Sequence, residues 1–151
     1  MKPTVNQQKA IDDRSGTLLI SAGAGSGKTA VLTKRLAMRL SDPSFGHDIS
    51  EYLIVTFTKA ATAELRERLT KALTEEVAAH PDNKYALRQL SRMGLAKICT
   101  IHSFCLDLIR ANFQVLGLPS KLRMADDAES QILCRGILDN ILEDMYATAS
   151  K

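Results

Sequence analysis

The sequence predicts an α/β fold in which a parallel sheet is flanked by helices. Three short, mostly apolar runs, residues 17–20, 52–56 and 97–101, have the length and composition of buried strands. Segments with helical character alternate with these runs, and that alternation is typical of parallel strands joined by right-handed crossovers. Ligands on such sheets bind at the carboxyl ends of the strands. We therefore expect the functional residues directly after each run.

Each run is followed by a segment with the marks of a helix. Residues 29–40 follow the first run, and residues 59–79 follow the second with apolar residues at every fourth position. Residues 83–93 form a further helix before the third run, and residues 103–113 follow that run. A turn at 116–120 precedes a last helix. Asp126 and Glu129 form a capping box at its start, and its apolar stripe includes Ile137.

Composition limits the class of protein. At 151 residues, with 45% apolar and 25% charged residues, the chain has the length and balance of one globular domain. The net charge of +3 is compatible with nucleic acid but does not by itself argue for it. Cys99, Cys105 and Cys134 include no Cys-x-x-Cys pair, so we expect reduced thiols and a cytoplasmic protein. No apolar stretch is long enough to predict a membrane span.

The run from residue 21 to residue 29, Ser-Ala-Gly-Ala-Gly-Ser-Gly-Lys-Thr, predicts a phosphate-binding loop between the first strand and the next helix. Glycines let backbone N–H groups approach phosphate oxygens, and the positive end of the following helix favours the anion. Lys28 would reach the β- and γ-phosphates, and the Thr29 hydroxyl would bind Mg²⁺. Ala22 stands where the strict pattern has glycine. We expect these residues to contact ATP: Ala22, Gly23, Ala24, Gly25, Ser26, Gly27, Lys28, Thr29 and Ala30.

The N-terminal string Thr-Val-Asn-Gln-Gln-Lys-Ala-Ile, residues 4–11, resembles the adenine-reading Q-motif of UvrD/Rep-type superfamily 1 helicases. Gln7 matches the glutamine of that motif. A glutamine amide can both donate to and accept from the edge of adenine, so its chemistry suits the role.

Two further strings resemble the DNA-contacting motifs Ia and Ib of the same helicases. In the first, Thr56 and Thr58 can bind phosphate and Phe57 can stack on a base, although Thr58 could be only a helix cap and Phe57 only a core residue. The second, Thr-Ile-His-Ser-Phe-Cys, begins at Thr100 and contains His102 and Ser103. Ser103 is equally a plausible cap, and a lone histidine after a strand is more often a packing residue. The resemblance assigns Thr100, His102 and Ser103 to the DNA path.

The resemblance implies more than the residues alone. It implies a RecA-like P-loop NTPase fold and a 3′–5′ helicase that uses ATP and Mg²⁺ on single-stranded and duplex DNA in double-strand-break repair. Within the family, the glycine-rich string and the motif at 100–105 are most similar to the helicase subunits of bacterial ATP-dependent helicase/nucleases. A second subunit is therefore an expected partner.

The chain lacks an apolar strand ending in Asp-Glu, which such helicases use to hold Mg²⁺, and it lacks an arginine finger. We therefore expect an N-terminal fragment that does not hydrolyse ATP by itself. Residues 1–115 would form part of the first motor domain, and residues 116–151 would begin an inserted helical subdomain.

Two alternatives belong to other classes. A small P-loop kinase requires arginines in a lid, and Arg14, Arg35 and Arg39 form no evident lid in the sequence. A DNA-binding module with a vestigial loop would bind DNA regardless of nucleotide, but the intact Gly-Lys-Thr argues against it.

Overall fold

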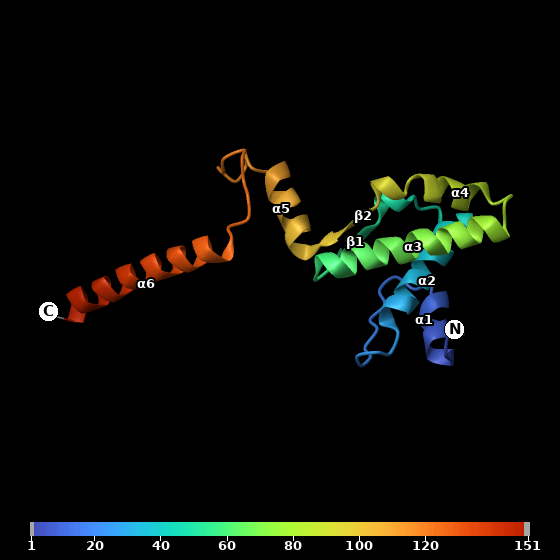
Figure 1. Cartoon of the computed structure of the whole chain (residues 1–151), viewed down its shortest axis with the longest axis horizontal. Helices are drawn as coiled ribbons and strands as arrows, with labels where there is room; N and C mark the ends of the chain where they lie inside the picture. The colour runs from blue at the N-terminus through green and yellow to red at the C-terminus, as the bar shows by residue number, and fades with distance from the viewer. Residues whose placement is uncertain (1, 150–151) are drawn as a thin grey trace. The chain divides into compact units, whose positions relative to one another are not determined.

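Residues 2–149 are described by a computed structural model with six α-helices, three short 3-10 helices and one two-stranded sheet (Figure 1). They divide into two compact units, one ending at Phe104 and one beginning at Cys105. This division falls before the predicted boundary at 115/116. The outermost positions of the two predicted domains, residue 1 and residues 150–151, lie outside the described residues. No helix within the described range is long and apolar enough to cross a membrane.

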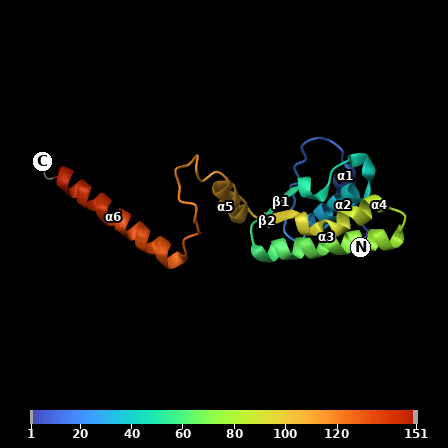
Figure 2. The same ribbon diagram turned by 90° about the horizontal axis from the view of Figure 1, so that it is seen from above.

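The first unit contains four complete helices and a small sheet (Figure 2). They are α1 (Val5–Asp12), α2 (Lys28–Ser41), α3 (Lys59–Ala79) and α4 (Lys84–Ser91), with 3-10 turns η1 (Pro43–Phe45), η2 (Ile49–Glu51) and η3 (Met93–Leu95). The predicted helix at 59–79 is confirmed in both its bounds. The predicted helix at 83–93 is shorter, because α4 ends at Ser91 and a 3-10 turn follows.

The sheet consists of β1 (Leu53–Thr56) and β2 (Lys97–Thr100), which run parallel with Thr56 opposite Thr100. These two strands confirm the second and third predicted runs. Only one face of the sheet is covered, since Ile54 and Ile98 are buried whereas Leu53 is 46% exposed. The strand at 53–56 is therefore buried on one face only, and not on both as its apolar composition indicates.

The first predicted strand, at 17–20, is also wrong, because this segment has no regular secondary structure. Its apolar side chains face solvent, and Leu19 is 91% exposed. A parallel strand is stabilised by ladder hydrogen bonds to its neighbours and by helices over its faces. The only strands in the described chain, β1 and β2, pair with each other, and the segment at 17–20 pairs with neither of them.

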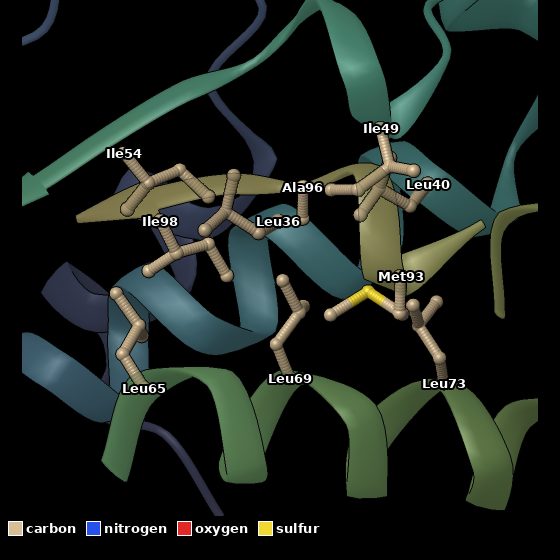
Figure 3. Close-up of a cluster of buried hydrophobic side chains, with 10 residues drawn as sticks. All are labelled: Leu36, Leu40, Ile49, Ile54, Leu65, Leu69, Leu73, Met93, Ala96 and Ile98. Carbon is tan, nitrogen blue, oxygen red and sulfur yellow. The ribbon is translucent and has the colours of Figure 1, made fainter. Parts of the chain in front are cut away.

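The core of the first unit lies between α2, α3 and the covered face of the sheet. Figure 3 shows three leucines projecting from α3: Leu65 toward Ile98 of β2, Leu69 toward Leu36 of α2, and Leu73 toward Met93 of η3. These three leucines recur at the four-residue spacing that is evident in the sequence, and all are buried. The apolar stripe of α3 thus fixes which face of this helix is turned inward.

The second unit contains most of α5 (Ile101–Ala111) and all of α6 (Asp127–Ala149). The predicted capping box forms, since Glu129 N donates to Asp126 Oδ1 at 2.8 Å and Asp126 N donates to Glu129 Oε2 at 3.2 Å. The apolar residues of these two helices, including the stripe predicted for the last helix, are not buried. Leu108 of α5 is 54% exposed and Ile137 of α6 is 58% exposed, because no second layer within this unit covers them.

Candidate nucleotide and nucleic-acid sites

The glycine-rich segment forms a tight turn that leads directly into α2. Gly25 and Gly27 have φ angles of 74° and 82°, the left-handed region that residues with a Cβ rarely occupy. Within the turn, the Ser26 N–H and hydroxyl both donate to Gly23 O, at 3.4 and 2.7 Å. The two glycines are therefore required for the curve that the backbone follows before the helix.

The N-terminus of α2 is open to an anion. Gly27 occupies the N-cap position, and no side chain caps the first turn. The N–H groups there carry the positive end of the helix dipole, which suits a phosphate group.

Lys28 and Thr29 stand at the start of the same helix. The Lys28 ammonium donates to Ala22 O at 2.6 Å and to Gly23 O at 2.7 Å, which leaves one of its three donors unused. The exposed Thr29 hydroxyl makes no hydrogen bond within the described residues, so an oxygen ligand is available for Mg²⁺. The donors therefore suit a triphosphate with Mg²⁺.

Gln7 lies against this turn although it is 19 residues earlier in the chain. Its Nε2 donates to Ser26 O at 2.9 Å, and its Oε1 accepts from Thr4 N at 2.8 Å as part of the capping box of α1. One amide hydrogen and one lone pair remain, and these could still contact a base. The structure thus brings the predicted adenine-reading residue to the predicted phosphate-binding loop.

The arginines considered for a kinase lid hold α1 against α2 instead. Arg35 Nη1 donates to Ala10 O at 2.6 Å, and Arg39 Nη2 donates to Asp13 O at 3.4 Å. Burial lowers the pKa of Arg35, and the neighbouring Arg39 lowers it further. Arg14 forms an ion pair with Asp42 at 3.2 Å. None of the three arginines is placed as a lid.

The second candidate site lies where β1 and β2 end. Thr56 and Thr100 are register partners, so the two strings expected to contact DNA leave the sheet at the same edge. Phe57 follows Thr56 and is 89% exposed, which excludes the core position considered for it. An exposed aromatic ring at a strand end is suited to stacking on a base.

Thr58 caps α3, because its hydroxyl accepts from Ala61 N at 3.1 Å. The Thr56 hydroxyl is also engaged within the protein, at 2.6 Å from Thr62 Oγ1 and 3.1 Å from Thr58 O. These hydroxyls are therefore ordered, and a phosphate would share them with existing hydrogen bonds.

The helix cap in the second string is a different residue from the one considered for that role. Thr100, not Ser103, is the capping residue: its Oγ1 accepts from Ser103 N at 3.2 Å and lies 2.9 Å from Ser103 Oγ. Thr100 is 8% exposed, and its hydroxyl is engaged at the start of α5. His102 is exposed in the first turn of α5.

A hollow of about 400 Å³ adjoins this edge and includes basic residues that were not expected from the motifs. Its lining is Lys59, Thr62, Ala63, Arg66, Ile98, Cys99, Thr100 and Ser103. Lys59 and Arg66 come from α3, seven residues apart and so on the same face of the helix. That spacing is the signal that could have identified them.

Three functional segments were expected at the ends of strands on one edge. Two of them are placed so by the Thr56–Thr100 register. The phosphate-binding loop is not at the end of a strand, because the segment before it forms none. Its position is instead set by α2 and by the hydrogen bond from Gln7.

Comparison with known proteins gives one family and several relatives. The UvrD/REP helicase N-terminal domain matches residues 4–151. The relatives include AddA proteins, each named as a subunit of an ATP-dependent helicase/nuclease. The one from Pelotomaculum thermopropionicum is 44% identical over 95% of this chain and 11% of that protein. The one from Clostridium novyi is 45% identical over 97% of this chain and 12% of its own length. The chain thus spans about a tenth of the length of these relatives.

Proposed function

The chain belongs to the UvrD/REP helicase N-terminal domain family, and from this premise we propose that it is the ATP-binding first part of an ATP-dependent DNA helicase. The parent protein would be one subunit of a helicase/nuclease, because the relatives carry that name. It would move 3′ to 5′ along single-stranded DNA, unwind duplex DNA and act in double-strand-break repair with a second subunit. The cytoplasm is the compartment in which we expect it to act.

The start of α2 is the observation that carries this proposal. It combines a glycine N-cap without a side-chain cap, two glycines with left-handed φ angles, and Lys28 and Thr29 in the first turn. ATP bound there would supply the free energy for movement. Lys28 would neutralise phosphate charge, Thr29 would bind Mg²⁺, and Gln7 would contact adenine.

We place the DNA path at the edge where β1 and β2 end. Phe57 would stack on a base, and Thr56, Thr58, Thr100, His102 and Ser103 would lie along the backbone. The hollow beside them adds Lys59 as a cation for a phosphate group. We also propose that residues 1–115 are part of a RecA-like motor domain and that residues 116–151 begin an inserted helical subdomain.

Titration with a fluorescent ATP analogue and Mg²⁺ tests the nucleotide site. We expect the 151-residue chain to bind weakly, to lose binding in Lys28→Ala, and to show affinity for a short single strand. We expect no hydrolysis, because the chain has no apolar strand ending in Asp-Glu. DNA-dependent hydrolysis by this chain, or nucleotide binding that is unchanged in Lys28→Ala, would contradict the proposal.

A further inference from the structure

The phosphate-binding turn is held by a residue outside it. Gln7 belongs to the first turn of α1, and its Nε2 donates to Ser26 O at 2.9 Å. Its amide is oriented by α1 itself, because Oε1 accepts from Thr4 N at 2.8 Å and Gln7 N donates to Thr4 Oγ1 at 3.3 Å. The capping box therefore fixes the direction in which Nε2 points.

The same amide packs on the glycine that ends the turn. A Cβ built on Gly27 would lie 3.1 Å from Gln7 Nε2, which is closer than ordinary van der Waals contact. Gly23 and Gly25 have no such neighbour within 4 Å. The glycine at position 27 thus serves two purposes, its positive φ angle and the close approach of the Gln7 amide.

The far end of α1 is also attached to the helix that follows the turn. Arg35 Nη1 donates to Ala10 O at 2.6 Å and Arg39 Nη2 to Asp13 O at 3.4 Å, so two arginines of α2 hold the last carbonyls of α1. With Gln7 at one end and these carbonyls at the other, α1 spans from the turn to the second half of α2. A displacement of α1 would therefore pull on the turn.

We propose that Gln7 is a positioning residue for the phosphate-binding turn, in addition to any contact with adenine. This inference rests on the proposed nucleotide site. It gives Gln7 an effect on every ligand that carries a triphosphate, whether or not it has a purine base. A residue that only reads adenine would affect ATP alone.

The test compares Mg–ATP with Mg–tripolyphosphate, which has no base, on the 151-residue chain. Gln7→Ala is measured beside Gln8→Ala, a control whose side chain bonds Asp12 and makes no hydrogen bond to the turn. We expect Gln7→Ala to weaken both ligands by about fivefold, the loss of one hydrogen bond, and Gln8→Ala to leave both unchanged. A loss confined to ATP would overturn the proposal.

Backbone ¹⁵N order parameters of residues 23–27, measured without ligand, separate this inference from the proposed function. These order parameters should fall in Gln7→Ala and stay unchanged in Gln8→Ala. Gln7→Glu keeps an acceptor for Thr4 N but has no donor for Ser26 O, so it should loosen the turn while α1 stays folded. If the unsubstituted 151-residue chain binds neither ligand, the proposed nucleotide site is refuted. The order parameters would still decide whether Gln7 holds the turn. Order parameters that are unchanged in both Gln7 variants would refute the positioning role.

Discussion

Arg66 should contribute more to the stability of the first unit than any surface ion pair. Its guanidinium donates from Nη1 to Met93 O at 3.1 Å, and from Nη2 to Ala96 O at 3.2 Å and Ile98 O at 3.4 Å. These carbonyls belong to η3, to the link after it and to β2, so one side chain of α3 fixes the entry into the second strand. Hydrogen bonds from a charged donor contribute about 1.5–3 kcal/mol when well formed and buried.

The magnitude follows from the geometry. The three bonds are of ordinary to long length and the side chain is half-buried, so we count well under 1 kcal/mol for each and expect Arg66→Ala to cost about 2 kcal/mol. In Arg66→Lys, a single ammonium cannot reach three carbonyls in the planar arrangement of a guanidinium, and we expect about half of that loss. Arg68→Ala, two residues along α3, removes only an exposed pair with Glu64 and should cost at most about 0.5 kcal/mol.

Urea denaturation followed by far-UV circular dichroism, with the m-value checked for constancy, measures all three variants. The expected order of destabilisation is Arg66→Ala, then Arg66→Lys, then Arg68→Ala. Equal midpoints for Arg66→Ala and Arg68→Ala would show that water replaces the guanidinium at the three carbonyls without cost. That result would refute the assignment of Arg66 as the link between α3 and β2.

Three further predictions concern the core, acid stability and DNA. Leu69→Ala should lower the free energy of unfolding by about 2–5 kcal/mol because Leu69 is fully buried, whereas Ile137→Ala on exposed α6 should change it by less than about 0.5 kcal/mol in the same urea titration. Hydrogen bonds from Ser50, and then the charges of Arg92 and Arg88, lower the pKa of Asp48. The ionised Asp48 carboxylate should stabilise the fold fully above the pKa of an unfolded carboxyl, about 4, and this effect should be lost as the pH falls through the lower pKa of the folded state. Asp48→Asn should therefore make the free energy of unfolding less dependent on pH in the acid range. Phe57→Ala should weaken single-strand binding by about 1–3 kcal/mol in a fluorescence anisotropy titration, without altering stability, if the ring stacks on a base.

The parts of the fold that the sequence predicts well are those fixed by local periodicity. The four-residue repeat through Leu65, Leu69 and Leu73 gives both the extent of α3 and its buried face. The capping box at Asp126 gives the start of α6. In each case the residues that decide the structure lie within one or two turns of each other, so a short window of sequence contains the whole signal.

The parts that the sequence does not predict depend on distant partners. The apolar run at 17–20 has the composition of a strand, yet a strand also needs neighbours, and none pairs with it in the described chain. The bond from Gln7 to Ser26 and the bonds from Arg66 to carbonyls 27–32 residues away have no local signature. The candidate sites were therefore predictable as residue types, whereas the contacts that hold them were not.

Helix caps distinguish the two candidate anion sites from each other. The start of α3 is capped by the Thr58 hydroxyl, and the Thr100 hydroxyl accepts from the third residue of α5. Each of these hydroxyls already accepts a hydrogen bond from one free N–H group of the first helical turn, so a DNA phosphate there would compete with the hydroxyl for that N–H group. The start of α2 has only Gly27 before it and keeps its N–H groups open. A threonine cap therefore leaves fewer free N–H groups for a phosphate than a glycine cap does. Inorganic phosphate added to the chain should therefore shift the amide resonances at the start of α2 at lower concentration than those at the start of α3.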